Sequence, residues 1–485
     1  MTSPIKFSGK FLIMGCLLGL AGCSVTQDFQ APEVEVKDDW RVSYDSAADM
    51  ANVEWWSSFN DPTLESLIDT ALKHNNDLGQ ATARVYELTG RYNMQNSAFY
   101  PQVGYGLSGG RSQRSLEQPY SFANSSVDRV NSSYNASLNI GWEIDVWGKL
   151  ARAEEAARAD VLAAEEGRQA VIMSLVSSVA VEYIDLLSLD HQLEIATQTV
   201  SERKASVELF ERKIKGGQIS ELELAQVRSA YEQAAAQIPI LELDIIHQEN
   251  RLSVLVGKAP GKIDRSGSLQ QLSQLELPQG LPSDLLVRRP DIRMSVQKLI
   301  AANARVGVAK TEHLPTLSLS GLLGYASDNL SNLFNGSAGL WEATAGSAGM
   351  LYTGGRIEGN VKQAEAIQQQ LIYEYQAMIQ TALREVDDSL SSIQKLRQLS
   401  VIQQRHVDVL EMYVEYAKSR HDAGYSRYME VLDAERNLYT ARINQTKTHR
   451  NIFASTVGMY KAMGGGWISA ADELTNKEQN KQVVQ

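Results

Sequence analysis

The feature that most constrains this chain is a stretch from Lys149 to Ile214 in which apolar residues recur every seven positions. The stretch has no proline and a single glycine, Gly167. Its seven-spaced residues are Ile172, Val179, Leu186, Leu193, Val200, Val207 and Ile214. A repeat of seven keeps one seam of a helix facing its partners and imposes a left-handed supercoil. A helix of this span is roughly 100 Å long, so the pattern predicts a rod rather than part of a compact core.

A second seven-spaced series turns the rod into a hairpin, and the hairpin occurs twice. After Gly217 the spacing resumes at Leu224, Tyr231, Ile238, Ile245 and Leu252. Residues 149–256 therefore predict an antiparallel helical hairpin with its tip at Gly217 and a kink at Pro239. A weaker series in the same register, 207 residues later, predicts a hairpin over 356–463 with its tip at Gly424. Internal duplication explains this pair best.

Alternating segments precede the hairpins and predict strands. In Tyr134–Glu143, one face carries Tyr, Ala, Leu, Ile and Trp, and the other carries Asn, Ser, Gly and Glu. Ten alternating residues with aromatic ends suit a membrane-spanning strand, although a strand of a soluble sandwich alternates in the same way. The predicted strands lie at about 101–110, 133–143, 315–325 and 340–350. The fourth alternates poorly and is inferred mainly from the repeat.

Four strands are too few to close a barrel, and an open sheet edge is excluded from lipid. We therefore expect the strands to close with those of other copies. Two copies would give eight strands around a filled interior, and three would give twelve around a lumen. The polar inward faces favour the wet lumen. The fold class is thus mainly α with a membrane β-barrel portion, built from a duplicated unit of two strands plus a long helical hairpin.

The first residues resemble a bacterial lipoprotein signal. Lys6 and Lys10 precede an apolar segment, so residues 1–22 predict a signal peptide. Residues 20–23, Leu-Ala-Gly-Cys, resemble a lipobox, which implies lipid on Cys23 and, with Ser24 after it, the outer membrane. Ordinary cleavage with a free thiol is the alternative. Residues 23–60 are expected to be a lipid-anchored extended segment on the outside of the assembly.

Composition excludes several classes of protein. The formal net charge of −12 without a basic run argues against nucleic acid. Two cysteines rule out a disulfide framework and a cysteine-built zinc site. The seven histidines lack metal-ligand spacing, and the G-x-G-x-x-G at 104–109 lacks the helix that a dinucleotide site needs. No internal stretch has 18–20 continuous apolar residues, so a membrane-spanning helix is not expected. We expect no enzyme, and no cofactor beyond covalent lipid.

Taken together, a set of short motifs resembles the TolC-like outer-membrane factors, specifically the lipoprotein (NodT-type) branch of resistance–nodulation–division efflux systems. Besides the lipobox, the motifs are Trp55-Trp56 before Asn60-Asp61-Pro62, Gly257-Lys258-Ala259-Pro260, Arg288-Arg289-Pro290-Asp291-Ile292, and Gly424 through Glu430-Val431-Leu432-Asp433-Ala434. The resemblance implies a homotrimer with a twelve-stranded outer-membrane β-barrel continued by a periplasmic α-helical barrel. It also implies a periplasmic adaptor protein, an inner-membrane pump, and passive conduction of small toxic or amphipathic compounds.

The resemblance also implies a periplasmic gate on the returning helix of the second hairpin. Glu430 and Asp433 match its inward carboxylates and lie three apart, on one helical face. Six such groups around one axis would repel each other and raise some carboxylate pKa values. Solvated surface residues are the alternative. The first copy has Glu223 and Gln226 at the matching positions. The tips at Gly217 and Gly424 would contact the adaptor.

This scheme divides the chain into a first repeat at 61–281, with a linker at 257–281, a second repeat at 282–463 and a tail at 464–485. Arg288, Arg289 and Asp291 are expected to form a structural cap and salt-bridge cluster. Two alternative functions share parts of this architecture. One is the outer-membrane duct of a type I protein secretion system, and the other is a lipid-anchored periplasmic scaffold.

Overall fold

The computed structural model describes residues 30, 32, 47–48, 54–113, 130–273, 277–278 and 285–464. The predicted signal peptide, Cys23 and the tail beyond Gly464 lie outside these residues. The chain divides into two compact units. The first contains Tyr86–Leu162 and Val296–Tyr373, and the second contains Glu33–Val85, Ala163–Ser295 and Glu374–Gln485.

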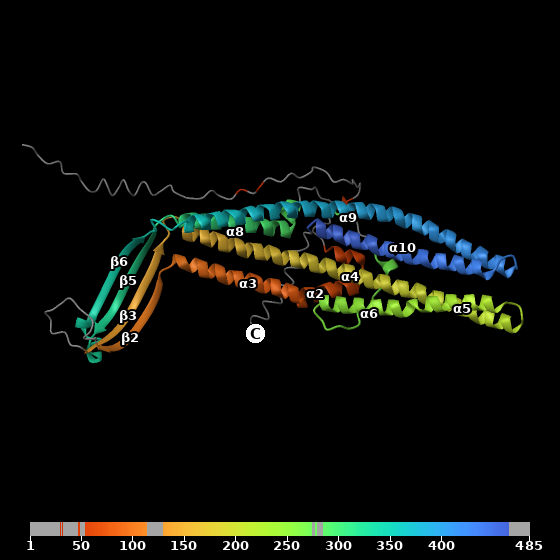
Figure 1. Cartoon of the computed structure of the whole chain (residues 1–485), viewed down its shortest axis with the longest axis horizontal. Coiled ribbons are helices and arrows are strands. Elements are labelled where there is room, and N and C mark those ends of the chain that lie inside the picture. The colour runs from red at the N-terminus through yellow and green to blue at the C-terminus, as the bar shows by residue number, and fades with distance from the viewer. Residues whose placement is uncertain are drawn as a thin grey trace, which may run out of the picture. The chain divides into compact units, whose positions relative to one another are not determined.

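The first unit is built on a four-stranded antiparallel sheet in the order β2-β3-β5-β6 (Figure 1). The strands are β2 (Gln102–Gln113), β3 (Val130–Ile144), β5 (Thr316–Ser327) and β6 (Gly339–Ala348). The register places Tyr105 opposite Leu138, Leu138 opposite Leu323, and Leu323 opposite Trp341. Residues that lie opposite each other on neighbouring strands share a face of the sheet. This row of four residues therefore forms one apolar band. The band is exposed, with Tyr105 82% and Trp341 78% accessible.

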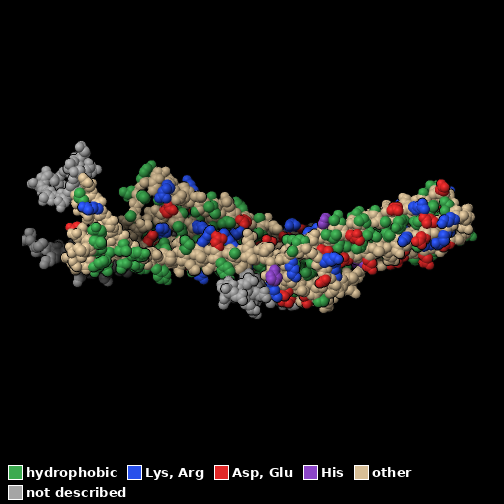
Figure 2. All heavy atoms as spheres, turned by 90° about the horizontal axis from the view of Figure 1, so that it is seen from below, with side chains coloured by type: hydrophobic (Ala, Val, Ile, Leu, Met, Phe, Trp, Pro, Cys, Tyr) green, Lys and Arg blue, Asp and Glu red, His purple; other side chains and the backbone are tan. Residues whose placement is uncertain are grey.

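The reverse face of the sheet is lined mostly by small and polar residues, although Leu322 of β5 and Leu340 of β6 also lie on it. It carries Gly104, Gly106, Ser108, Asn135, Ser137, Asn139, Ser318, Ser320 and Thr344. Figure 2 shows charged side chains crowded over the ends of the helical hairpins and scarce over the sheet. One apolar face and one small, polar face is the pattern of a membrane sheet with lipid on one side and water on the other. Strand β6 belongs to this sheet although the alternation of apolar and polar residues along it is weak.

The second unit contains the ends of two helical hairpins (Figure 1). The first hairpin is α4 (Lys149–Lys215), α5 (Glu221–Ala235) and α6 (Gln237–Leu255), and the second is α9 (Arg356–Asp422) and α10 (Tyr428–Ala462). Helices α4 and α9 both have 67 residues, which matches the duplication inferred from the sequence. Shorter elements of the chain are η3 (Ser97–Phe99), η4 (Leu269–Gln271), η6 (Leu330–Asn332), η7 (Gly336–Ala338), and β1 (Ala47–Ala48) paired with β4 (Leu277–Pro278).

The returning arm of the first hairpin breaks upstream of the predicted kink. Helix α5 ends at Ala235 and α6 begins at Gln237. The ring of Pro239 would clash with the carbonyl four residues earlier, that of Ala235. The helix is therefore interrupted directly after Ala235, whose carbonyl the proline ring would clash with, and not at Pro239 itself.

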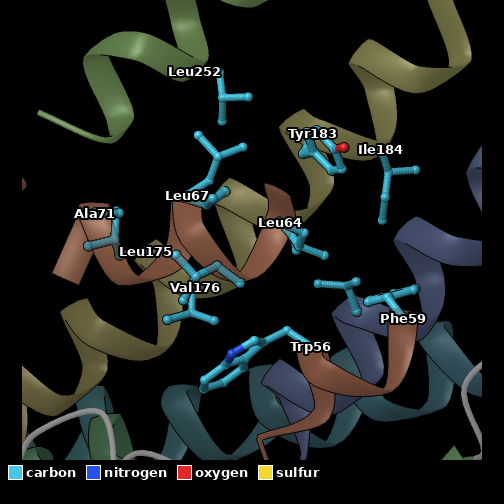
Figure 3. Packing of buried hydrophobic residues seen from close by; sticks show 14 of the residues in the cluster. Trp56, Phe59, Leu64, Leu67, Ala71, Leu175, Val176, Tyr183, Ile184 and Leu252 are labelled. Atoms are coloured by element: carbon cyan, nitrogen blue, oxygen red, sulfur yellow. The ribbon is translucent and has the colours of Figure 1, made fainter. Parts of the chain in front are cut away.

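The tryptophans that precede the first repeat lie inside the second unit, so an extended segment on the outside is wrong for residues 55–59. They form the 3-10 helix η2 (Trp55–Phe59), in which both tryptophans and Phe59 are buried. Trp55 stacks on Tyr460 of α10 with ring centroids 5.5 Å apart. Figure 3 shows Trp56 and Phe59 facing the packed aliphatic side chains of Leu64 and Val176. Burying the rings of Trp55, Trp56 and Phe59 stabilises the packing of η2 in the core of the second unit by several kcal/mol.

Residues 62–96 form two helices, α2 (Pro62–His74) and α3 (Asn76–Asn96). Asn75 between them has an extended backbone, with ψ 129°. Its Oδ1 accepts a hydrogen bond from the backbone N of Leu78 at 2.9 Å, and its Nδ2 donates to the carbonyl of Leu255 at 2.8 Å. The buried side chain of Asn75 therefore caps the start of α3 and also links it to the end of α6.

Asp61 caps α2, because its Oδ1 accepts a hydrogen bond from the backbone N of Leu64 at 3.0 Å. The same carboxylate also accepts from the hydroxyl of Tyr183 on α4 at 3.0 Å. Burial, together with the negative charge of Asp61, raises the pKa of Tyr183 to about 12. The cap therefore also ties α2 to the longest helix of the first hairpin.

Arg289 holds the start of the second repeat together as part of the salt-bridge cluster expected from the sequence. It lies between α7 (Leu285–Arg288) and α8 (Pro290–Thr311) and is 3% exposed. Its guanidinium pairs with Asp291 at 2.7 Å and with Glu385 of α9 at 2.8 Å. It also donates to the carbonyl of Ala462 at 3.1 Å. Hydrogen bonds on several sides of one buried cation are the arrangement that makes such burial tolerable.

Helix α4 contains a stretch that is apolar enough, by length and composition, to cross a membrane. No such stretch was expected from the sequence. Most of that stretch is buried within the protein. Ile172, Val179, Tyr183 and Leu186 of α4 are completely covered. The stretch is therefore the core-facing part of a long helix.

Candidate functional site

The two hairpin tips reverse direction in the same way. Gly217 has φ 70° and Gly424 has φ 80°, conformations that favour glycine. The backbone N of Gln218 donates to the carbonyl of Lys213 at 3.0 Å, and that of Tyr425 donates to Arg420 at 2.9 Å. Both tips are thus Schellman caps, which satisfy the last carbonyls of the outgoing helix.

An aromatic cluster just above the tips joins the two hairpins. Phe210 of α4 packs on Tyr428 of α10, with ring centroids 4.5 Å apart, and stacks with His421 of α9 at 6.1 Å. The hydroxyl of Tyr428 donates to Oγ of Ser206 on α4 at 2.9 Å. Both tyrosine contacts cross from one repeat to the other. The ends of the hairpins therefore behave as one packed bundle rather than as two separate rods.

Glu430 and Asp433 lie in the first two turns of α10 and line one groove. The groove, which we call the tip groove, lies between α5 and α10; its polar lining includes Arg203, Gln226, Ser229, Glu430, Asp433 and Arg436. The structure thus brings together the two candidate gate carboxylates and the Gln226 that matches Asp433 in the first copy.

The two carboxylates have different surroundings. Asp433 accepts from Arg436 and from Nδ2 of Asn437, the latter at 3.1 Å. Glu430 makes no side-chain hydrogen bond or ion pair with the residues that the structure describes. Its charge is free to act in the groove, and the positive end of α10 favours it there. Within one chain the groove also holds the cations Arg203 and Arg436, which offset the two negative charges.

Glu223 is placed differently from Glu430, although the two match in the repeat. Its carboxylate accepts from the backbone N of Ser220 at 2.9 Å and from the Ser220 hydroxyl at 3.1 Å. The bond from the Ser220 N–H lowers the pKa of Glu223. Together with the bond from Glu223 N to Ser220 Oγ, this is a capping box at the start of α5. In the second copy Arg427 stands where Ser220 stands in the first, and α10 has no side-chain cap.

Two parts of this site were not predicted from the sequence. The capping box was readable as Ser220-x-x-Glu223 ahead of an apolar-periodic helix. The contact of Phe210 with Tyr428 had no such signal, because it joins residues 218 positions apart in different repeats. Among the described residues, no group of three or more His, Cys, Asp or Glu is placed to hold a metal ion.

A sheet with one lipid-type face, carried on a duplicated frame of helical hairpins with acidic residues beside their tips, defines the class of outer-membrane channels with a periplasmic extension. The chain belongs to the outer membrane efflux protein family, whose model matches residues 67–258 and 281–465. The family resemblance and the fold class predicted from the sequence are thereby confirmed.

Named relatives span almost the whole chain. It is 31% identical to the toluene efflux pump outer membrane protein TtgF of Pseudomonas putida, covering 96% of this chain and 98% of that protein. It is 32% identical to the cation efflux system protein CusC of Escherichia coli K12, covering 94% and 99%. It is 30% identical to the probable outer membrane lipoprotein SilC of Salmonella typhimurium, covering 95% and 100%.

A solved structure agrees with these relatives. The Campylobacter jejuni CmeC outer membrane channel superposes with a TM-score of 0.88 at 26% identity, covering 93% of this chain and 98% of that one. The protein is therefore an outer-membrane channel of an efflux system, lipid-anchored in the bacterial outer membrane.

Proposed function

We propose that three copies of this chain close one twelve-stranded barrel in the outer membrane and continue it as a helical tube across the periplasm. The observation that carries this is the sheet, with an apolar face, a mostly small and polar reverse face, and β2 and β6 as its outer strands among the described residues. Unpaired backbone groups in lipid cost several kcal/mol each, so the outer strands pair with other copies. Three copies, unlike two, leave room for a lumen.

The lumen is a passive duct for small toxic or amphipathic compounds. Energy comes from an inner-membrane pump, and a periplasmic adaptor joins the pump to the hairpin tips at Gly217 and Gly424. The identical caps at the two tips support a repeated contact surface, because they present the same backbone shape in each repeat of the chain. The relatives are named for cargoes as different as toluene and a cation. A wide, polar bore with little chemical selectivity of its own fits that range.

Glu430 and Asp433 form the periplasmic gate in this proposal. Trimerisation would bring three Glu430 carboxylates toward one axis, where their charges attract cations and raise some of their pKa values. Asp433 contributes less charge, because Arg436 and Asn437 hold its carboxylate. Glu223 contributes least, because the described residues that line the tip groove do not include it and Ser220 fixes its carboxylate at the helix cap.

Cys23 carries the lipid anchor in this proposal, through two acyl chains on its sulfur and one on its amine. Each buried methylene stabilises membrane attachment by about 0.8 kcal/mol, so several chains make it lasting. The anchor holds each copy beside the barrel before and after the strands close.

Conductance across a planar bilayer tests the duct. Purified protein should open stable, ion-conducting pores, and a lipid-anchored scaffold would open none. Susceptibility of a deletion strain to toxic small molecules separates efflux from protein secretion. Greater susceptibility of the deletion strain, reversed when the wild-type chain is supplied, supports efflux. Unchanged susceptibility together with the loss of a secreted protein would favour a type I secretion duct.

A further inference from the structure

We propose that the tip groove binds one amphipathic organic carboxylate per chain, and that the guanidinium of Arg203 holds the carboxylate group of this ligand. The groove lies within a single chain, between α5 and α10. The site therefore does not depend on the proposed trimer. It goes beyond the duct and its gate, because it assigns a class of small-molecule ligand to the groove beside the gate carboxylates.

Arg203 of α4 is a buried cation without a counter-ion. It is 6% exposed and lines the tip groove. Its Nη1 donates a hydrogen bond to the carbonyl of Ala230 on α5 at 2.6 Å, whereas its buried Nε has no hydrogen-bond partner. Among the residues that the structure describes, no carboxylate forms an ion pair with Arg203. A buried charge without a partner is unfavourable, so this guanidinium favours the entry of an anion.

Two acidic residues of α10 are already engaged with other cations. Asp433 of the groove pairs with Arg436. Glu435 pairs with Lys418 of α9 at 2.9 Å, and its side chain is 10% exposed. Each of these pairs is neutral as a unit. Neither carboxylate is therefore available to neutralise Arg203 without breaking an existing pair.

The charge of Arg203 acts instead on two tyrosines. Burial raises the pKa values of Tyr428 and Tyr439, and the positive charge of Arg203 opposes the rise in both. Tyrosine is neutral near pH 7, because its ordinary pKa is about 10. These two side chains lie close enough to feel the cation, but they cannot balance its charge. Glu430 also lines the groove, but no ion pair joins it to Arg203.

The rest of the groove suits a ligand with a charged end and an apolar body. Its volume of about 740 Å³ lies in the range of small-molecule sites. Apart from its charged residues, the lining combines hydrogen-bonding and larger apolar side chains: Gln226, Ser229, Gln233, Tyr413, Met429 and Leu432. A guanidinium can donate to both oxygens of a carboxylate. The apolar side chains can then cover the body of the ligand.

Benzoate and benzamide test the site, because they have the same shape and differ in charge. Full-length protein in a non-ionic detergent is titrated with each compound at fixed ionic strength, and binding is followed by ligand-observed NMR. The wild type should bind benzoate about tenfold more tightly than benzamide, because charge-assisted hydrogen bonds are the stronger ones. Inorganic phosphate should bind more weakly than benzoate, because it has no apolar body.

Three variants assign the preference to Arg203. Arg203→Met should lower the affinity for benzoate to that for benzamide. Arg203→Lys keeps the charge without the forked geometry, so it should retain part of the preference. Arg228→Met is the matched control on α5, since Arg228 is outside the described groove lining, is 56% exposed and pairs with Glu211 at 2.6 Å. It should keep the wild-type affinity.

Unfolding without ligand separates binding from a structural role. Arg203→Met should not lower the midpoint of thermal unfolding, because it removes a buried charge that has no counter-ion. A midpoint lower by several degrees would make Arg203 a structural residue and overturn the site. Equal affinities of the wild type for benzoate and benzamide would also overturn it, as would a preference that survives in Arg203→Met or is lost in Arg228→Met. Phosphate that binds as tightly as benzoate would reject the amphipathic class of ligand.

Discussion

Asn75 and Arg289 stand directly before α3 and α8, and each donates a side-chain hydrogen bond to the last carbonyl of the returning helix in its own repeat. Asn75 Nδ2 lies 2.8 Å from the carbonyl oxygen of Leu255, and Arg289 Nη1 lies 3.1 Å from that of Ala462. Next to these carbonyls, Gly257 and Gly464 both have positive φ. The duplication therefore preserved a joint, while its chemistry diverged from a neutral amide to a buried cation held by two carboxylates.

Replacing Asn75 by alanine should weaken this joint in the first repeat. The change removes the N-cap of α3 and leaves the Leu255 carbonyl without its side-chain donor, a loss of about 2 kcal/mol. The midpoint of thermal unfolding, followed by circular dichroism in detergent, should fall by several degrees. Asn93→Ala, at an exposed position in the same helix, is the matched control and should leave it unchanged. Equal midpoints for the two variants would show that the joint carries no stability.

Arg289→Met should be more damaging, because it leaves Asp291 and the Ala462 carbonyl without their buried partner. Breaking one side of a buried ion pair costs about 3–5 kcal/mol. Arg289→Lys keeps the charge but not the forked geometry, so it should fall between the wild type and the methionine variant. Heat resistance of the assembled protein on gels is the readout.

Arg293→Met is the control for Arg289. Arg293 pairs with Glu166 at 2.7 Å but is 39% exposed, and an exposed pair contributes about 0–1 kcal/mol. A loss as large as that of Arg289→Met would contradict the special role of the Arg289 cluster.

The gate proposal predicts unequal effects for two matching glutamates. Glu430→Gln, alone or with Asp433→Asn, should weaken the block of single channels by multivalent cations by several-fold, because it removes free negative charge. Glu223→Gln should change the block far less, because the described lining of the tip groove does not include Glu223, whose carboxylate Ser220 fixes at the start of α5. Planar-bilayer recordings at fixed ionic strength measure both. A block that is unaltered in Glu430→Gln, or equally weakened in Glu223→Gln, would remove Glu430 from the gate.

Acid should destabilise the bundle through His449. Its Nε2 lies 3.1 Å from Oγ of Ser400 on α9, and burial, with a smaller effect from His191 on α4, lowers the pKa of His449. The folded state then binds fewer protons than the unfolded state as pH falls below the ordinary histidine value of about 6.5. Stability therefore rises with pH across this window and is lost as pH falls through it.

His449→Gln should flatten the pH dependence of the unfolding midpoint between about pH 5 and 7.5, a window that follows from the ordinary pKa of histidine. His406→Gln, at an exposed position of α9, should preserve the wild-type slope. A slope that survives in His449→Gln would assign the pH dependence to other groups.

Much of the fold was predictable because it follows from periodicity. The spacing of seven from Ile172 to Ile214 marks α4, and the alternation in Tyr134–Glu143 marks the middle of β3. The repeat supplied β6, whose own alternation is weak. These patterns are readable because a helix seam and a pleated face impose fixed periods on local sequence.

The rest depends on single side chains and distant contacts. Asn75 breaks a helix because Leu255, 180 residues away, accepts its second hydrogen bond. Trp55 is buried because Tyr460 of the last helix covers it. The difference between Glu223 and Glu430 arises one turn earlier, where Ser220 can cap a helix and Arg427 does not. Periodicity carries no information about such contacts.

The mass of the detergent-extracted wild-type protein tests the central claim most directly. Native mass spectrometry of material from outer membranes should show three copies of the lipidated chain in one particle. A particle that contains one chain, or two, would contradict a barrel closed by three identical four-stranded sheets.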